Sequence, residues 1–511
     1  MKKTLSLILA MLMCFSVMVS CGGGKTDDPT ATTTTVAGND TPTDNATTTT
    51  VEETESPYDQ NGFLKDDIPD DLKYNDQEIA ILYWDDIARP EFVVEEQTGD
   101  LISDAIFLRN AAVEERLGVK LNWHGIPGSY WVQQDFVTHA ANDVRSGGEY
   151  DLIASYSMAA VTMTLQGLFR NLMDADHMNL EQPWWPKSLA ENSTINDRLY
   201  FCSGDISTNL LHQMFIMLYN KQLAAEYQIP DLYELVNKGE WTIDKMAELA
   251  STAYSDLNGN ATVDAADQFG ISVRQHLVFD SFFISSDLHS IEKDANGTLI
   301  MSDELISEKT HTLLGKVISI FHESPYAAYP TVVEGWSNAG FADGRAVFII
   351  DLSNVTSSDE FADTAVTYGV LPTPKYDVEQ EEHITCLEFG FTMYSASIAV
   401  SDQELDTIGA MLECMASEAY RQVTPAVFET AMKLKYSSGD NDAMMYDLIR
   451  NGISFDTGRI FCEPLDKLTF SAFREACNLA TPHWTSIMKA KGKILQKRLE
   501  ALVATLETLP E

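Results

Sequence analysis

The apolar positions that follow the polar N-terminal stretch alternate between the spacing of strands and the spacing of helices. Residues 78–84 (EIAILYW) form a short apolar run that predicts a buried strand, and 104–117 carry apolar residues at helical spacing. A second strand and a second helix are predicted at 119–123 and 132–145, and a third strand at 150–155. Strands that alternate with helices in this way predict an α/β lobe with a largely parallel sheet.

The second half of the chain is richer in helical periodicity. Apolar residues recur at the spacing of an amphipathic helix over five stretches, 242–254, 303–321, 402–420, 425–434 and 484–506. Thr242 is of a residue type that caps helix N-termini. No short-period repeat indicates a solenoid or a propeller. The chain from residue 57 to 511 is too long for one hydrophobic core, which predicts two lobes.

The N-terminus has the order of features that secretory signals share. Lys2 and Lys3 precede a short apolar run at 5–19, and small residues lead into Cys21. This order predicts a signal peptide at residues 1–20. The position of Cys21 directly after Val-Ser resembles the lipobox of bacterial lipoproteins, which implies a lipidated Cys21 on the extracellular face of the cytoplasmic membrane. The alternative is an ordinary signal peptide followed by an unmodified cysteine.

Residues 21–56 are composed mainly of Gly, Thr, Asp and Pro, and the sequence TTTTV occurs at 32–36 and again at 47–51. Such a stretch has little apolar surface to bury, so it predicts a disordered tether. A flexible chain of this length would span roughly 30 Å, enough to hold a folded body clear of lipid headgroups. Acyl chains and a tether would anchor the protein to the membrane without spanning it.

Charge and cysteine content narrow the class of protein. The formal net charge of −43 argues against nucleic acid or an anionic membrane surface as a partner. Beyond Cys14 and Cys21 there are five cysteines, Cys202, Cys386, Cys414, Cys462 and Cys477. Their number is odd and none forms a C-x-x-C pair, which predicts buried thiols and no disulfide framework or zinc site.

Motifs for catalysis are missing from the sequence. There is no G-x-S-x-G elbow, Walker loop or G-x-G-x-x-G, and His322-Glu323 lacks the second histidine of a zincin. No spacing singles out an acid–base pair among the histidines and carboxylates. We therefore expect no enzyme, although a glycosidase would need only two positioned carboxylates and stays an alternative.

Several short segments occur in a characteristic order between residues 76 and 450. They are YDLI at 150–153, GLFRNL at 167–172, LYF at 199–201, MLYNK at 217–221, GEWT at 239–242, FADGRAVF at 341–348 and YGVLPTPKY at 368–376. Together they resemble the family 1 extracellular solute-binding proteins, the lipoprotein receptors of sugar-importing ABC transporters. The segment at 239–242 departs from the family pattern because it lacks the proline.

This resemblance implies an α/β, two-lobed periplasmic-binding-protein-like fold (type II) with three crossover segments and an interlobe cleft. The first lobe is expected at 57–198 and 342–392, and the second, helix-rich lobe at 199–341 and 393–511. The implied function is a membrane-anchored receptor that captures a carbohydrate, an oligosaccharide above all, and delivers it to ABC permease subunits. A surface glycan-binding lipoprotein without a transport role is the alternative.

Sugar binding needs flat apolar faces for the rings and polar groups for the hydroxyls. The candidate ligand-binding residues are Trp336, Trp131, Tyr130, Tyr156, Trp184, Trp185, Asp205 and Asp351. Trp336 precedes the 341–348 segment, where cleft residues cluster in the resembling family. Tyr130 and Trp131 lie in a polar loop after a predicted strand, where ligands bind in open α/β sheets. The alternative for each aromatic residue is core packing.

Oxygen-bearing side chains recur at every second position in the segment 256–267. They are Asp256, Asn258, Asn260, Thr262, Asp264 and Asp267, at positions 1, 3, 5, 7, 9 and 12 of a twelve-residue frame. This is the ligand spacing of an EF-hand loop and predicts a structural calcium ion, Ca2+, as cofactor. Ala261 replaces the usual glycine at position 6, and Asp267 is shorter than the usual glutamate. A solvated Asn/Asp-rich turn is the alternative.

Overall fold

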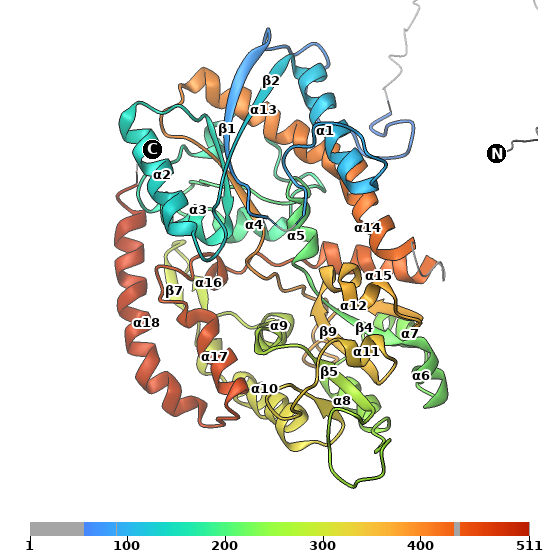
Figure 1. Cartoon of the computed structure of the whole chain (residues 1–511). Helices are drawn as coiled ribbons and strands as arrows, with labels where there is room; N and C mark the ends of the chain where they lie inside the picture. Colours follow the sequence, from blue (N-terminus) through green and yellow to red (C-terminus); the bar gives the residue numbers. More distant parts are fainter. Residues whose placement is uncertain (1–55, 88, 434–439, 510–511) are drawn as a thin grey trace, which may run out of the picture. The chain divides into compact units, whose positions relative to one another are not determined.

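The computed structural model of the chain describes residues 56–87, 89–433 and 440–509 (Figure 1). The predicted signal peptide, the lipidated Cys21 and all but the last residue of the predicted tether lie outside the described residues. Pro57–Glu511 forms one folded unit, which contains two main β-sheets. In the described part of the chain, no helix combines the length and the apolar character needed to cross a membrane.

The first sheet has the strand order β11-β3-β1-β2. It is made of β1 (Gln77–Trp84), β2 (Val119–Ile126), β3 (Leu152–Tyr156) and β11 (Thr392–Ala396). β1 pairs in parallel with β2 and with β3, whereas β11 is antiparallel to β3. The apolar patterns of the first 100 described residues thus predict three parallel strands correctly. β3 is buried throughout, whereas β2 at the sheet edge alternates between buried and exposed positions at its start.

The second sheet has the order β10-β4-β9-β5-β8. Its strands are β4 (Phe215–Asn220), β5 (Phe269–Val273), β8 (Ala327–Ala328), β9 (Ala346–Leu352) and β10 (Tyr368–Leu371). β5 is parallel to β8 and β9, and β4 is antiparallel to β9 and β10. Every residue of β4, β5 and β9 is buried, so this sheet is the centre of the second lobe.

The strand pairing corrects the predicted division into lobes. The prediction assigned 342–392 to the first lobe, but β9 and β10 pair with β4 in the second sheet. It assigned 393–511 to the second lobe, but β11 pairs with β3 in the first sheet. Apolar patterns identify a strand and say nothing about which sheet it joins, because that choice is made by contacts distant in sequence.

The helices are grouped around these two sheets (Figure 1). Near the first sheet lie α1 (Leu101–Leu117), α2 (Gln133–Ser146), α3 (Ser157–Thr164) and α13 (Asp402–Glu418). Near the second sheet lie α6 (Lys221–Glu226), α7 (Leu232–Asn237), α8 (Ile243–Ser251), α11 (Ala339–Ala342), α12 (Asp359–Ala362) and α15 (Asp440–Asn451). Between these groups run α4 (Lys187–Ser193), α5 (Thr208–His212) and α14 (Thr424–Lys433).

A helical subregion extends from the second sheet. It contains α9 (Phe279–Ser285), α10 (Glu308–Ile318), α16 (Thr457–Ile460), α17 (Leu468–Asn478), α18 (Trp484–Leu506) and the hairpin β6 (Ile291–Lys293) and β7 (Leu299–Met301). The helix predicted at 484–506 is α18, and Thr242 caps α8 by accepting a hydrogen bond from the Lys245 backbone N–H. The helix predicted at 303–321 is divided into the 3-10 turn η3 (Asp303–Ile306), α10, and a π turn at Ser319–Glu323.

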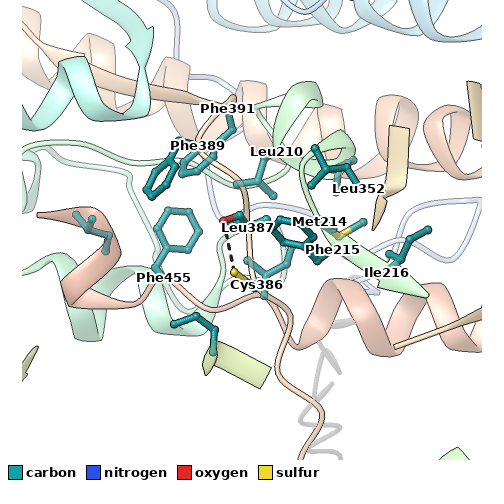
Figure 2. Packing of buried hydrophobic residues seen from close by; sticks show 14 of the residues in the cluster. Leu210, Met214, Phe215, Ile216, Leu352, Cys386, Leu387, Phe389, Phe391 and Phe455 are labelled. Carbon is teal, nitrogen blue, oxygen red and sulfur yellow. Dashed lines mark hydrogen bonds between the residues drawn. The ribbon is translucent and has the colours of Figure 1, made fainter. Parts of the chain in front are cut away.

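The chain crosses between the lobes three times, as predicted. The first crossover leads from β3 to β4, the second from β10 to β11, and the third from α13 through α14 to α15, which packs on β10. The first two crossovers run side by side at the antiparallel Met214–Leu387 bridge, and a second antiparallel bridge joins Cys202 of the first crossover to Tyr394 of β11. Figure 2 shows that apolar side chains from both segments pack together with Phe455. A paired, two-stranded connection of this kind is suited to hinge motion.

The five cysteines of the folded part are free, and all five are buried, which agrees with the predicted burial. Burial raises the pKa of Cys386 and of Cys414 to about 12, so both stay protonated thiols at neutral pH. They contribute to packing as small apolar side chains.

Candidate functional site

A cleft of about 860 Å³ lies between the first lobe and the helical subregion of the second. The first-lobe wall consists of Trp84, Asp86, Ile87, Ser129, Tyr130, Trp131, Tyr156 and Met158. The facing wall consists of His276, Leu277, Lys467, Phe470, Ser471, Arg474, Glu475 and Asn478, and the crossovers supply Asn209, Gln213, Glu388, Phe389 and Gly390.

The first-lobe wall is built at the carboxyl ends of the parallel strands. Trp84 ends β1, Tyr156 ends β3, and the loop after β2 carries Tyr130 and Trp131. The carboxyl ends of parallel strands meet at one edge of a sheet, where open α/β folds bind their ligands. The predicted candidates Tyr130, Trp131 and Tyr156 are therefore brought together in the cleft, as expected from their places after strands.

One carboxylate holds the loop after β2 in place. Asp86 accepts hydrogen bonds from the backbone N–H of Gly128 at 2.7 Å and of Ser129 at 2.9 Å. It also accepts one from the Ser129 hydroxyl at 2.5 Å. These bonds lower the pKa of Asp86 despite partial burial, so the carboxylate stays ionised. The loop that presents the two aromatic rings is thus anchored to the strand beside it.

Four aromatic rings form a continuous chain along this wall. Trp84 packs edge-to-face on Tyr156 with centroids 5.6 Å apart, Tyr156 contacts Tyr130 at 6.3 Å, and Tyr130 contacts Trp131 at 4.9 Å. Tyr156 is 6% exposed, whereas Trp131 is 88% exposed at the lip of the cleft. The chain of rings therefore runs from a buried end at Trp84 and Tyr156 to an exposed end at Trp131.

Lys467 connects the two walls. Its ammonium donates a hydrogen bond to the Tyr130 hydroxyl at 3.1 Å, lies 4.6 Å from the centre of that ring, and pairs with Glu463 at 3.0 Å. Asp466 and Lys467 have φ angles of 53° and 59°, directly before α17. The same left-handed pairs occur at Asn75–Asp76 and Asn196–Asp197, away from the cleft, so the conformation fixes the turn before α17 without marking a site.

Glu388 and Arg474 of the cleft lining belong to a cluster of opposite charges with Asp280 and Arg459, which do not themselves line the cleft. Asp280 is 2% exposed and accepts hydrogen bonds from Arg459 at 2.7 Å and from Arg474 at 2.8 Å. Glu388 lies 3.6 Å from Arg459 and 3.8 Å from Arg474. Two buried carboxylates thus face two guanidinium groups. Burial, followed by the positive charge of Arg474, lowers the pKa of His276, which favours its neutral form.

The polar groups that remain for a ligand are largely uncharged. The two cations that line the cleft in the described residues, Lys467 and Arg474, both have acidic partners. Glu475 pairs with Lys491 at 2.6 Å. The uncharged amides and hydroxyls in the lining are those of Asn209, Gln213, Asn478, Ser129 and Ser471. The Ser129 hydroxyl already donates to Asp86, the Asn209 amide to Glu91, and the Asn478 Oδ1 accepts from Tyr329. The capacity that remains, above all at Gln213 and Ser471, suits hydrogen bonds with hydroxyls, while the rings suit apolar faces.

The structure does not place Trp336 in the cleft. This side chain is 5% exposed, packs edge-to-face on Phe269 with centroids 4.8 Å apart, and lies under Arg345 at 5.2 Å. The prediction of a ligand-binding Trp336 is therefore replaced by a core role. Its ring fills the space beside Gly340, where even a Cβ would lie 2.4 Å from it.

Trp184 and Trp185 are also buried and outside the cleft. Both indole N–H groups donate to Glu413 of α13 at 2.9 Å. Burial raises the pKa of Glu413 to about 7. The two indoles therefore fasten this part of the first crossover to α13.

The two predicted carboxylates are engaged in buried ion pairs. Asp205 accepts from Arg450 at 2.7 Å and from the Thr424 hydroxyl at 2.9 Å. It lies with Trp185 at a separate pocket of about 360 Å³. Asp351 pairs with Arg274 at 3.1 Å and accepts from Asn338 at 2.8 Å. Neither carboxylate lines the cleft, because each forms an ion pair with an arginine from a distant segment of the chain.

Sequence reasoning missed most of the facing wall. Lys467, Phe470 and Arg474 belong to a helix whose pattern gave no local sign of a site, and Glu388 lies in a crossover. Trp84 of the first-lobe wall was missed as well, although an aromatic residue at the end of a predicted strand is a recognisable signal.

The segment 256–267 forms a coiled loop after α8. Asp256 accepts the backbone N–H groups of Gly259 at 2.7 Å and of Ala261 at 2.8 Å. Ala261 has a φ of 59°, so the alanine takes the left-handed conformation that glycine usually supplies at position 6. This departure from the EF-hand pattern is therefore accommodated in the backbone.

The loop also holds a buried oxygen without a partner. Asp264 accepts from Asn258 at 3.1 Å and from Asn260 at 2.7 Å. Asp267 is 0% exposed, and its Oδ1 has no hydrogen-bond partner. Among the described residues, no three His, Cys, Asp or Glu side chains converge into a metal-binding group. The carboxylates of the loop instead bond to amides and backbone N–H groups.

No protein-family model matches the chain, and no curated protein matches it in sequence. Solved structures match its fold. The cyclic α-maltosyl-1,6-maltose binding protein of Arthrobacter globiformis is 13% identical with a TM-score of 0.55, covering 83% of this chain and 100% of its own. The sugar-binding protein MalE of Xanthomonas citri is 11% identical with a TM-score of 0.54, covering 85% and 100%.

UgpB of Mycobacterium tuberculosis, in complex with glycerophosphocholine, has a TM-score of 0.52 at 13% identity, over 83% of this chain and 99% of its own. At these identities the similarity concerns the fold. The chain has the mixed α/β, two-sheet fold of periplasmic-binding-protein-like structures over most of its length.

Proposed function

We propose that this protein is a lipid-anchored extracellular solute-binding receptor that captures an uncharged carbohydrate, an oligosaccharide, in its cleft and delivers it to an ABC permease. The observation that carries the proposal is the chain of aromatic rings from Trp84 to Trp131 facing uncharged amides and hydroxyls. Rings stack on the apolar faces of sugars, and the polar groups bond to their hydroxyls. The names of the structures with a similar fold, which include sugar-binding proteins, support this class of ligand.

The charge balance of the cleft supports an uncharged ligand. Arg474 already faces Asp280 and Glu388, and Lys467 faces Glu463. An anionic ligand would have to compete with these carboxylates for the cations, at the cost of leaving a carboxylate unpaired. Binding of a neutral sugar leaves all of these pairs intact.

The role is reversible capture and not catalysis. Hinge motion at the paired crossovers would separate the walls and admit the ligand, and closure would bring Lys467 against Tyr130. The closed, liganded form is the one that a permease could recognise, because only this form combines the surfaces of both lobes in one arrangement.

Titration of tryptophan fluorescence against a panel of sugars tests the proposal. Neutral oligosaccharides should change the emission and raise the melting temperature, because Trp131 at the lip becomes covered. Peptides, polyamines and glycerophosphodiesters should have no effect. A thermal shift with one of those compounds, and none with any oligosaccharide, would contradict the assigned ligand class. Loss of uptake of the same sugar on gene deletion would separate a transport receptor from a surface glycan-binding protein.

The anchor can be tested independently of the ligand. Cys21→Ser should move the protein from the membrane fraction to the medium and abolish its labelling by radioactive palmitate. Unchanged membrane association of the variant would contradict lipidation. Sugar binding should be the same in both forms, because every residue that lines the cleft belongs to Pro57–Glu511.

We also propose that the 256–267 loop binds a structural calcium ion. The supporting observations are the left-handed Ala261 and the unpartnered Oδ1 of the buried Asp267, an oxygen that a hard cation would satisfy. The side chains of Asp256, Asn258, Asn260, Asp264 and Asp267 and the carbonyl of Thr262 would supply the ligands. The ion would tie the end of α8 to the start of β5.

Chelator should lower the melting temperature of the wild-type chain, and Asp256→Ala should abolish this sensitivity. Asp294→Ala is the matched control, because Asp294 accepts the backbone N–H groups of Asn296 and Thr298 in an exposed turn that lacks the ligand spacing. That variant should keep the chelator sensitivity of the wild type. Melting that does not respond to chelator in any variant would contradict the calcium proposal.

A further inference from the structure

A second hollow, of about 710 Å³, lies along α18, and we call it the α18 groove. It shares no lining residue with the cleft. Its lining combines apolar side chains with a row of lysines, namely Met301, Ile306, Met488, Lys489, Lys493 and Lys497. In Figure 1, α18 is the long helix that runs along one side of the helical subregion. Ile306 is 58% exposed in this groove, so an apolar surface lies open to water.

The lysines of the groove differ from the other basic residues of the same helix. Lys491 pairs with Glu475 at 2.6 Å and Arg498 pairs with Asp466 at 2.7 Å. Among the described residues, Lys489, Lys493 and Lys497 form no ion pair, and Glu500 is the acidic residue in the groove lining. In a chain of net charge −43, a row of unpaired lysines is a local reversal of sign. Because the Debye length at physiological salt is about 8 Å, this local charge decides what can bind here.

Gly492 opens the middle of the groove. It lies in the interior of α18, where glycine is a poor helix former. A Cβ at this position would meet only Met488 Cε at 3.7 Å and Met301 Cε at 3.9 Å, which are ordinary contacts. Packing within the protein therefore does not require the glycine. The missing side chain leaves a notch in the groove wall, where another backbone or side chain can approach closely.

We propose that the α18 groove docks an acidic amphipathic helix of a partner protein. The groove is concave and has an apolar floor, which fits the apolar face of a helix. Lysines at positions i, i+4 and i+8 span about 12 Å along α18, and glutamates repeated every four residues along a docked helix have the same spacing.

A flat anionic bilayer fits the groove less well. A planar surface cannot fill a concave groove, so a bilayer would leave the apolar floor of the groove uncovered. The convex, acidic segment satisfies both the shape and the charge of the site.

The test uses the full chain and two synthetic helical peptides, followed by fluorescence anisotropy. One peptide carries Glu at i, i+4 and i+8 beside a Leu face, and the other carries Lys at those positions. The acidic peptide should bind and the basic one should not. Lys493→Glu should weaken binding of the acidic peptide about tenfold or more, because it places like charges together. Lys491→Glu is the matched control on the same helix and should leave binding nearly unchanged.

The variant Gly492→Leu tests whether weaker peptide binding comes from a filled groove and not from an unfolded protein. Leucine is a better helix former than glycine, so the variant should melt at a higher temperature. Its side chain would occupy the notch, so the acidic peptide should bind more weakly to a more stable protein. Equal binding of both peptides, equal effects of the Lys491 and Lys493 variants, or binding of anionic vesicles in place of the acidic peptide would overturn the proposal.

Discussion

The cleft and the α18 groove are hollows of similar size, but they differ in whether their positively charged side chains have acidic partners. The cleft measures about 860 Å³, and its lining cations are paired with carboxylates of the protein itself. The groove measures about 710 Å³, and its three lysines have no acidic partner among the described residues. Volume and apolar lining alone do not distinguish the two.

The difference shows how charge pairing selects the class of occupant. A hollow whose charges are already satisfied gains little from a charged ligand, because each new ion pair breaks an old one. A hollow with unpaired charges gains from a partner of opposite sign. The cleft is therefore suited to an uncharged small molecule and the groove to an acidic macromolecule.

The largest effect is expected from removing the charge that neutralises the cleft. Asp280→Asn would leave two buried guanidinium groups without their shared carboxylate, which typically lowers the free energy of unfolding by about 3–5 kcal/mol. Urea denaturation measures this loss. At low temperature the variant cleft should gain affinity for anionic sugars, and unchanged discrimination would contradict the charge argument.

The second largest effect is expected from salt concentration, which should change the binding affinity of the groove and not that of the cleft. Binding of the acidic peptide to the groove should weaken about tenfold between roughly 50 mM and 500 mM salt, because exposed charges are screened. Sugar binding in the cleft should stay constant over the same range. Calorimetric titrations at both concentrations make the comparison. A salt-sensitive sugar affinity would show that the cleft is not neutral toward its ligand.

Trp131→Ala should weaken sugar binding by about 1 kcal/mol, since the ring supplies an aromatic platform at the lip. It should leave the melting temperature unchanged, because the side chain is 88% exposed. Trp336→Phe is the matched control and should do the reverse, lowering stability while leaving sugar affinity intact. Fluorescence titration and thermal melting distinguish these outcomes, and a shared effect of both variants would contradict the separation of core from site.

The smallest effect is expected from a substitution in the wall of the α18 groove, and it concerns stability. Gly492→Ala should raise the free energy of unfolding by about 1 kcal/mol, because alanine is the better helix former and its Cβ meets no close contact. Sugar affinity should not change. A destabilised variant would show that the glycine is required for packing.

The sequence predicted those features that depend on local pattern. The three parallel strands of the first sheet, though not β11, followed from apolar patterns, α18 from its periodicity, and the cap of α8 from Thr242. The position of Tyr130 and Trp131 after a strand identified one wall of the cleft. Each of these features is encoded within a few consecutive turns or strand residues, where spacing and residue type suffice.

Tertiary structure alone decided which sheet each strand joins and which tryptophans face a ligand. Trp336 and Trp131 have the same chemistry, and one is 5% exposed and the other 88%. Lys467 and Tyr130 are far apart in sequence, as are Glu388 and Arg474, and they meet only when the crossovers bring the lobes together. The burial and the ion pairing of a side chain depend on residues from distant parts of the chain, so no local sequence pattern predicts them.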